Sequence, residues 1–391
     1  MNILLINWEG INAMQGESQF LFSHLQKMFD CELLTLERCI NSLDMKFNPQ
    51  VRYKYSLIDK ALMIKEYMET REELTGTLDA IISDDLCLSF ANLKTPIISI
   101  ADTPYFPIWN SLVSNGKTGK QELYEFGIIR RELQKQQYMK SKHIISINRF
   151  MKNYVKDACG KTAEIISPGV DMDFFFKKDN LEETLELKAK YGIPPFQDVG
   201  IAVTDFSIDT NWEMLAKIIR DNPKIFWIIG LIGGGGYKIK SPNAKIFTGI
   251  NEELLRDLYW CSDFYIDTVP IRGSNLFSFQ AMSCDLPIVT MPCGYFAENE
   301  LTYEREYNDE SGIVPTDCGI IVIKNDLNAF NLAIRDALLS KKGELYDLRP
   351  RDSIDQRCLD YDTFAAKYRA TIDSVIKGEE YVDLEMQYMQ Q

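Results

Sequence analysis

Residues 247–291 read FTGINEELLRDLYWCSDFYIDTVPIRGSNLFSFQAMSCDLPIVTM, and this stretch decides the fold. Short runs of β-branched and aromatic residues alternate in it with segments whose apolar residues recur at helical spacing. We therefore expect the order strand, helix, strand, turn, helix, strand, which is the repeating unit of a parallel α/β sheet.

The polar turn of this stretch lies directly before its second helix, which is expected to begin near Leu276. A helix N-terminus carries backbone N–H groups without intrahelical partners and the positive end of the helix dipole, so it suits a phosphate. Gly273 allows close approach of a ligand, and Ser274 or Asn275 can cap the helix. Arg272 can add donors. The turn predicts a diphosphate site; the alternative is an ordinary N-cap turn.

Outward from this stretch, the same alternation covers the chain in two blocks. Expected strands of the first block are 2–6, 80–83, 96–100, 143–147 and a last one at 165–166, and those of the second are 200–203, 224–230, 245–247, 264–267, 287–291 and 319–323. We predict an N-terminal Rossmann-like domain (1–175), a linker (176–198), a C-terminal Rossmann-like domain (199–345), and C-terminal helices with an acidic tail (346–391).

Composition supports a globular protein with two cores: 391 residues, of which 46% are hydrophobic. The net charge of −14 disfavours nucleic acid or an anionic membrane as the main partner, since both attract basic surfaces. One local basic segment, RRELQKQQYMKSK at residues 130–142, remains; a solvated helix face is its simpler interpretation.

The nine cysteines are scattered without a Cys-x-x-Cys pair, which is typical of reduced thiols in a cytoplasmic protein. With only two histidines we expect no metal site, and the pair Asp84-Asp85 is as readily a loop or a helix start. The N-terminus lacks the pattern of a signal peptide, and no apolar segment has the length of a membrane span. We expect cytoplasmic localisation and no stable membrane insertion.

Several segments, in their order, resemble the GT-B glycosyltransferases, in particular family 4. They are SINRFMKNYVKDACGKTAEIISPGVDMDFF (146–175), IFTGINEELLRDLYWCSDFYI (246–266), AMSCDLPIVTM (281–291) with the following residues 293–298, and CGIIVIKNDLNAFNLAIRDALL (318–339). The resemblance implies an α/β protein of two Rossmann-like domains facing a cleft, the GT-B fold. It also implies a nucleotide-sugar donor, a UDP-sugar, bound by the C-terminal half.

The chain departs from family 4 at the donor site. Two glutamates eight positions apart are usual there, and the matching positions are Arg272 and Gln280. Gln280 can hydrogen-bond a ribose or sugar hydroxyl but supplies no charge, and we assign it a catalytic role. The basic residues with which the family binds the donor phosphates are absent from residues 204–211. Within this segment we predict that Thr204 contacts the donor. The segment 267–275 is instead similar to O-GlcNAc-transferase-like protein glycosyltransferases.

The resemblance also implies roles for residues outside the turn. Gly249 and Ile250 would offer backbone groups to the nucleotide base, or else form a plain turn at a strand end. Gly10 and Gly16 flank a loop at the end of the first strand, on the acceptor side of the cleft. Asp102 would act as a base or bind a sugar hydroxyl; capping the turn that follows it is the structural alternative.

The function expected from these features is transfer of a hexose or N-acetylhexosamine from a UDP-sugar to a glycan or protein acceptor. The transfer would need no metal ion, and the resemblance to family 4 favours retention of configuration. A second hypothesis is a non-catalytic GT-B subunit that binds acceptor and supports a catalytic protein partner. A third is a sugar-nucleotide epimerase, which would call for acidic residues and histidines that are scarce here. Nucleic acid is not expected as a partner.

Overall fold

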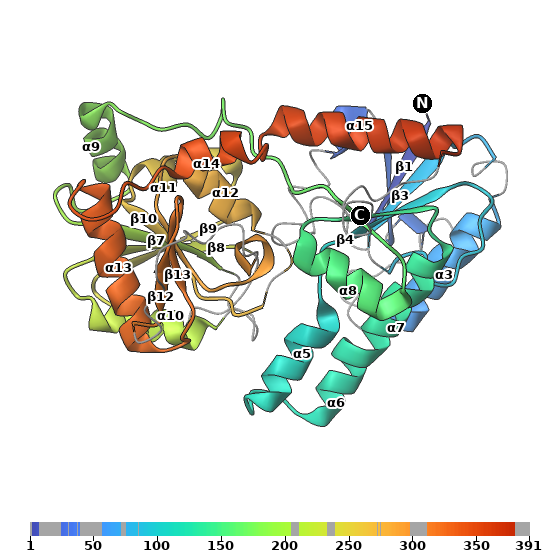
Figure 1. Ribbon diagram of the computed structural model, residues 1–391, viewed down its shortest axis with the longest axis horizontal. Coiled ribbons are helices and arrows are strands. Elements are labelled where there is room, and N and C mark those ends of the chain that lie inside the picture. Colours follow the sequence, from blue (N-terminus) through green and yellow to red (C-terminus); the bar gives the residue numbers. More distant parts are fainter. Residues whose placement is uncertain are drawn as a thin grey trace, which may run out of the picture. The chain divides into compact units, whose positions relative to one another are not determined.

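The computed structural model describes residues 2–7, 25–29, 31–36, 38–39, 57–71, 76–84, 86–204, 211–232, 239–271, 273, 275–297 and 311–379. By its internal contacts the chain divides into two compact units. The first unit comprises residues 1–167 together with 365–391, and the second comprises residues 168–364. The polypeptide therefore passes from one unit to the other twice, and the C-terminal residues return to the first unit (Figure 1).

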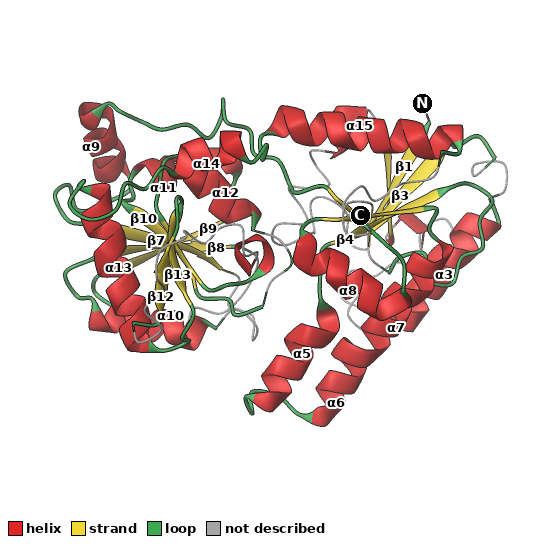
Figure 2. Ribbon diagram, viewed as in Figure 1, coloured by secondary structure: helices red, strands yellow, loops and turns green. Residues whose placement is uncertain are grey.

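The first unit is built on a parallel sheet, whose strands within the described residues lie in the order β2-β1-β3-β4-β5-β6. They are β1 (Ile3–Asn7), β2 (Glu32–Thr35), β3 (Ala80–Asp84), β4 (Ile97–Ala101), β5 (His143–Ser146) and β6 (Glu164–Ile165). The strands β1, β4 and β5 are buried along their whole length. Such burial is expected of parallel strands that helices cover on both faces (Figure 2).

Helices connect and cover these strands. They are α3 (Leu57–Glu69), α5 (Tyr105–Ser114), α6 (Lys120–Glu122), the π-helix η2 (Leu123–Ile129), α7 (Arg130–Lys140), α8 (Arg149–Cys159) and the C-terminal α15 (Tyr361–Lys377). α15 is tied to the sheet by Thr371, whose Oγ1 donates to Glu164 Oε2 at 2.8 Å. His143 Nε2 lies 2.8 Å from the same carboxylate oxygen. These contacts fix the last long helix on the first unit.

The second unit has a sheet in the order β12-β13-β11-β10-β7-β8-β9 among the described residues, parallel except for β12. Its strands are β7 (Val199–Thr204), β8 (Phe226–Leu231), β9 (Ala244–Thr248), β10 (Phe264–Asp267), β11 (Ile288–Thr290), β12 (Ile313–Pro315) and β13 (Gly319–Val322). Trp227 and Phe264 pack edge to face in its core, with ring centroids 5.6 Å apart. This geometry is the one that aromatic pairs prefer.

Helices surround the strands of the second unit. They are α9 (Leu181–Lys190), α10 (Trp212–Asp221), α11 (Glu252–Trp260), α12 (Leu276–Ser283), the 3-10 turn η4 (Gly294–Ala297), α13 (Leu327–Lys341) and α14 (Pro350–Gln356). The side chains of preceding residues cap three of them, α9, α11 and α13. Asn251 Oδ1 accepts from Leu254 N at 2.9 Å before α11, and Asp326 Oδ1 accepts from Ala329 N at 2.9 Å before α13. Both bonds satisfy a backbone N–H that the helix itself leaves unpaired.

The predicted α/β class with two mostly parallel sheets is confirmed. Three elements escaped the sequence pattern: the edge strands β2 and β12, and the π-helix η2. β2 has only one buried residue in four, so its apolar run is weak. A π-helix has one more residue in its hydrogen-bonded turn than an α-helix. A segment this short is not long enough for the spacing of its hydrophobic residues to reveal that difference.

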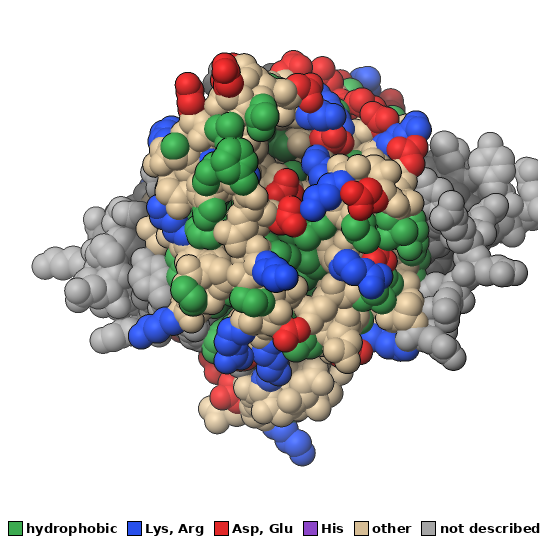
Figure 3. Space-filling view, turned by 90° about the vertical axis from the view of Figure 1, so that its left-hand side faces the viewer, with side chains coloured by type: hydrophobic (Ala, Val, Ile, Leu, Met, Phe, Trp, Pro, Cys, Tyr) green, Lys and Arg blue, Asp and Glu red, His purple; other side chains and the backbone are tan. Residues whose placement is uncertain are grey.

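The basic segment 130–142 is helical, as α7, but it is not solvated all round. Leu133, Gln134, Gln137 and Tyr138 are buried along one face of the helix. Charge elsewhere is mixed. On the side of the molecule turned to the viewer in Figure 3, Lys and Arg side chains are interspersed with Asp and Glu. The net negative charge is therefore not gathered into one patch on that face.

Candidate functional site

The second unit has a topological switch point between β7 and β10. From β7 the chain moves outward through β8 to β9, then returns to the other side of β7 with β10. In open parallel sheets, ligands bind outside the carboxyl ends of the strands at such a point. The carboxyl end of β7 is Thr204, and that of β10 is Asp267.

Buried polar residues follow both strand ends. Thr204 is 7% exposed and Asp267 is 4% exposed, and Asp267 Oδ1 accepts from Val269 N at 3.0 Å. Asn211, which precedes α10, donates from Nδ2 to Thr268 O at 3.1 Å. This bond joins the segment before α10 to the turn after β10. The two segments that border the switch point thus hold each other in place.

α12 begins next to this point and is buried over its full length. Asn275 occupies its N-cap position, but the capping role predicted for its side chain is wrong. Its Oδ1 instead accepts from Tyr295 N at 2.7 Å, in the turn after β11. That longer-range bond fixes the start of the helix against a neighbouring turn. Gly273 is also buried at this helix start, whereas Arg272 and Ser274 lie outside the described residues.

Three polar atoms at this helix are buried and meet no hydrogen-bond partner among the described residues. They are Asn275 Nδ2, Ser278 Oγ and Gln280 Oε1. The three residues are at most 1% exposed. A buried polar atom without a partner costs about 1–3 kcal/mol, and such groups are rare in native proteins. Because three of them fall within six residues, the start of α12 is a candidate site for a polar ligand.

Gln280 was predicted from the sequence, whereas Ser278 was missed. The available signal was a serine in the first turn of a mostly apolar helix, LFSFQAMS. Helix-interior serines are so common that this signal alone carries little weight. What distinguishes Ser278 is its complete burial, which only the packed structure reveals.

Gly249 and Ile250 lie at the carboxyl end of β9. Gly249 is exposed and has a φ of +65°, which suits glycine at this turn. β9 is separated from β10 by β8 and β7. With strands about 4.8 Å apart, the ends of β9 and β10 lie about 14 Å from each other. That span suits an extended nucleotide with its base at Gly249 and its diphosphate at α12.

In the first unit, Asp102 follows β4 and is 7% exposed. Thr103 Oγ1 donates to Asp102 Oδ1 at 2.9 Å, and Gln134 Nε2 donates to Thr103 O at 2.8 Å. No side chain caps α5, whose N-cap residue is Pro104. Asp102 is thus held at the carboxyl edge of the first sheet. The predicted acceptor-side residues Gly10 and Gly16 lie outside the described residues.

The nearby α15 adds a buried tyrosine to this environment. Burial raises the pKa of Tyr368, and the carboxylates of Asp102 and Glu164 raise it further. The phenol therefore stays protonated at neutral pH. It brings no negative charge to the surroundings of Asp102.

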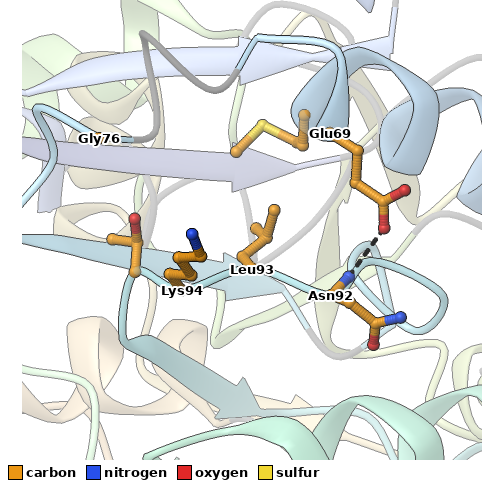
Figure 4. A pocket seen from close by; sticks show the side chains of 7 residues that line it. Glu69, Gly76, Asn92, Leu93 and Lys94 are labelled. Carbon is orange, nitrogen blue, oxygen red and sulfur yellow. Dashed lines mark hydrogen bonds between the residues drawn. The ribbon is translucent and has the colours of Figure 1, made fainter.

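A cavity of about 570 Å³ lies elsewhere in the first unit (Figure 4). Its lining comes from the end of α3 and from the segments before β3 and β4: Met68, Glu69, Gly76, Asn92, Leu93, Lys94 and Thr95. Glu69 Oε1 accepts from Asn92 N at 3.0 Å. This cavity borders the amino ends of the strands, whereas Asp102 lies at their carboxyl ends. It is therefore separate from the candidate site of this unit.

Two absences within the described residues concern metal ions and membranes. No three His, Cys, Asp or Glu side chains of that part of the chain come together as ligands for a metal ion. Among the same residues, no helix combines the length and the apolar character needed to cross a membrane.

No protein-family model matches the sequence, and no curated protein does either. Solved structures do match. Sucrose-phosphate synthase from Thermosynechococcus elongatus superposes with a TM-score of 0.74 at 13% identity, covering 97% of this chain and all of that chain. HepE from Anabaena, in complex with UDP-glucose, gives 0.66 at 15% identity over 96% of this chain and 100% of its own. WaaG, a glycosyltransferase of lipopolysaccharide biosynthesis, gives 0.67 at 12% identity, covering 95% and 99%. The chain has the GT-B fold of these proteins, which confirms the fold predicted from the sequence.

Proposed function

We propose that this GT-B protein is a glycosyltransferase that binds a nucleotide-sugar, a UDP-sugar, at the carboxyl edge of the second sheet. It transfers a hexose or N-acetylhexosamine to a glycan or protein acceptor. The observation that carries the proposal is a set of three buried polar atoms, on Asn275, Ser278 and Gln280, that have no hydrogen-bond partner among the described residues. They lie at a helix that starts beside the switch point of a nucleotide-binding type of sheet.

The chemistry of glycosyl transfer suits this arrangement. The bond between the anomeric carbon and the phosphate oxygen breaks, and negative charge grows on the departing diphosphate. Backbone N–H groups and the positive end of the α12 dipole stabilise that charge, with Arg272 adding its guanidinium. Asn275 Nδ2 and Ser278 Oγ are further donors. Gln280 then binds a ribose or sugar hydroxyl through its amide, and no step requires a metal ion.

The donor is proposed as a UDP-sugar on two grounds. The span of about 14 Å between the ends of β9 and β10 suits a nucleoside diphosphate. The similar fold of HepE is known in complexes with UDP and with UDP-glucose. Gly249 and Ile250 would contact the base of the nucleotide. Thr204 would contact the part of the donor that lies between the base and the diphosphate. Retention of configuration is favoured by the family 4 resemblance, since the leaving phosphate can then assist the acceptor.

Asp102 is proposed as the residue of the first unit that contacts the acceptor. Its buried carboxylate at the end of β4 can bind a sugar hydroxyl or accept its proton. Gly10 and Gly16 are proposed on the same acceptor side. A mild base is enough in a retaining transfer, so the change Asp102→Asn should weaken acceptor binding more than donor binding.

One observation favours a second function, a non-catalytic GT-B subunit that supports a catalytic partner. Family 4 enzymes carry carboxylates where this chain has Arg272 and Gln280. A neutral amide cannot balance the positive charge that develops on the sugar ring. A protein with this site could bind donor or acceptor without turning it over.

The deciding experiment is a calorimetric titration of the full chain with UDP, GDP, ADP and CMP. Binding of UDP alone would support the donor assignment, and a panel of UDP-sugars would then be tested for hydrolysis and transfer. UDP binding without turnover of any sugar would support the subunit. Binding of none of the four nucleotides would contradict the donor site itself.

Arg272→Ala is a variant matched to this titration. We expect UDP affinity to fall about tenfold, because hydrogen bonds to a charged group contribute about 1.5–3 kcal/mol. The melting temperature should stay nearly unchanged. Equal affinity in the variant would remove Arg272 from the site.

A further inference from the structure

The cavity of about 570 Å³ in the first unit has no part in the activity proposed for the second unit (Figure 4). It lies at the amino ends of β3 and β4, between the end of α3 and the segments that lead into the two strands. Its volume falls within the range of pockets that hold small molecules, about 300–1,000 Å³. A molecule held here would leave the carboxyl edge of the sheet, where Asp102 lies, open to another ligand.

One wall of the cavity carries a carboxylate that the protein itself occupies. Glu69 is the one acid among the described residues that line the cavity. Lys65 Nζ lies 2.5 Å from its Oε2, and Asn92 N donates to its Oε1 at 3.0 Å. These bonds, first of all the one from Lys65, hold the pKa of Glu69 below its ordinary value, so the group is charged at neutral pH. Glu69 is therefore a structural part of the wall.

The facing wall carries a cation. Lys94 is exposed, and its amine makes no hydrogen bond or ion pair with any residue that the structure describes. Figure 4 shows Lys94 and Leu93 extending side by side from the segment before β4. An ammonium group has three N–H donors and no acceptor, so its complement is an anion.

A second lysine adds to the positive charge around the cavity. Lys140 Nζ donates to Ser89 O at 2.7 Å and to Ala91 O at 3.1 Å, and its charge lowers the pKa of the cavity's carboxyl group further. With Lys65 and Lys94 it makes three cations against one carboxylate, a local charge of +2 in a protein of net charge −14. A phosphate monoester carries about −1.5 to −2 at pH 7, which balances this charge. A monocarboxylate would balance only half of it.

We propose that this cavity binds a small organic phosphate monoester. The phosphate oxygens accept from the amine of Lys94, and the carbon body of the ligand lies against Met68 and Leu93, the apolar residues of the lining. Lys65 and Lys140 stabilise the phosphate through their charge. The site does not depend on the donor or the acceptor residues proposed above.

The test is a calorimetric titration of the full chain with phenyl phosphate, inorganic phosphate and benzoate, each with and without excess UDP. UDP occupies the candidate site at α12, so a phosphate that binds in its presence binds elsewhere. We expect phenyl phosphate to bind one site under both conditions, and benzoate to bind about tenfold more weakly, because it carries half the charge. Phenyl phosphate affinity should fall between about pH 7.5 and pH 5.5, since the phosphate takes up a proton with a pKa of about 6.

Two variants should move the affinity in opposite directions. Lys94→Gln removes a charge-assisted hydrogen bond and should weaken phenyl phosphate about tenfold. Glu69→Gln keeps an acceptor for Asn92 N and removes the negative charge of the wall, so affinity should rise about threefold. The matched control is Lys217→Gln, an exposed cation on α10 in the second unit, which should leave phenyl phosphate binding unchanged. Melting curves verify that each variant is folded.

The proposal is overturned if the wild type binds no phenyl phosphate, or if Lys94→Gln and Lys217→Gln bind it alike. It is also overturned if UDP abolishes the binding, because the phosphate would then lie at α12. If UDP itself does not bind, only the donor site is contradicted, since the effect of Lys94→Gln is measured without UDP as well.

Discussion

The two sheets of this protein share an architecture, but a buried glutamine and serine in the first unit differ from a buried glutamine and serine in the second. In the first unit, Gln137 lies fully buried under the sheet and both ends of its amide are paired. Its Oε1 accepts from Leu88 N at 2.6 Å, and its Nε2 donates to Ser99 Oγ at 2.9 Å. Ser99 Oγ continues to Ser141 Oγ at 2.7 Å. The protein itself satisfies this network.

In the second unit, Gln280 and Ser278 are equally buried on α12, yet Gln280 Oε1 and Ser278 Oγ meet no partner among the described residues. A buried glutamine and serine therefore stabilise the first unit through their hydrogen bonds. In the second unit the same residue types carry a desolvation cost that no described residue offsets. Burial of a polar atom is tolerated without a protein partner where a ligand supplies the hydrogen bond. The contrast supports our proposal that the ligand site lies at α12 and not in the polar core beside β4.

The largest expected effect comes from breaking the satisfied network. Gln137→Leu leaves the buried Leu88 N–H without an acceptor and takes a donor from Ser99. We expect a loss of about 3 kcal/mol, because each buried unsatisfied group costs about 1–3 kcal/mol. The melting temperature should fall by roughly 10 °C, and UDP affinity at the remaining folded protein should not change. A loss below 1 kcal/mol would mean that water satisfies this site.

Gln280→Leu is the matched change at the unsatisfied position. It removes a buried oxygen that has no partner, so the melting temperature should move by less than about 3 °C, in either direction. Affinity for a UDP-sugar, or its turnover, should fall about tenfold. Thermal melting and calorimetry on the two glutamine variants separate the roles. A large loss of stability in Gln280→Leu would mark this residue as part of the core.

Ser278→Ala sharpens the comparison with a smaller change. The hydroxyl meets no protein partner, and alanine favours the helix by about 0.5 kcal/mol, so the free protein should be as stable or slightly more stable. UDP binding should weaken three- to tenfold, as for a lost hydrogen bond of about 1 kcal/mol. Ser99→Ala is its counterpart and should lower stability by about 1 kcal/mol without affecting UDP. If Ser278→Ala destabilises as much as Ser99→Ala, the two units do not differ.

The sequence predicted the parts of this contrast that depend on local pattern. Buried parallel strands are continuous apolar runs, so β4, β7 and β8 could be located from composition alone. The turn before α12 and the position of Gln280 also followed from the chain, the latter by family resemblance. These features need only the order of residues and the geometry of helices and strands.

What the sequence left open depends on contacts between distant residues. Asn275 was expected to cap its own helix, but it binds Tyr295, twenty positions on, because the turns after β10 and β11 meet. Whether a buried serine has a hydrogen-bond partner depends on what packs around it, so the sequence alone did not distinguish Ser99 on β4 from Ser278 on α12.

The smallest expected effect concerns a half-buried carboxylate, Asp263, which has one hydrogen-bond partner and is partly desolvated. Asp263 precedes β10, and its Oδ2 accepts from Val199 N at 2.8 Å. Burial raises the pKa of Asp263, although the bond from Val199 N opposes the shift. A folded-state pKa above the unfolded one means that the folded protein holds this proton more tightly. The resulting stability is present at low pH and is lost as pH rises through the raised pKa.

Asp263→Asn keeps an acceptor for Val199 N and removes the titration. We expect its melting temperature, relative to the wild type, to rise between about pH 4 and pH 7, by roughly 1–3 °C. Nucleotide affinity should be unaffected, since Asp263 lies at the amino end of β10 and the candidate site at the carboxyl end. A constant difference across this pH range would show that the Val199 bond balances the burial. Asp263 would then belong with Gln137, as a group that the protein fully satisfies.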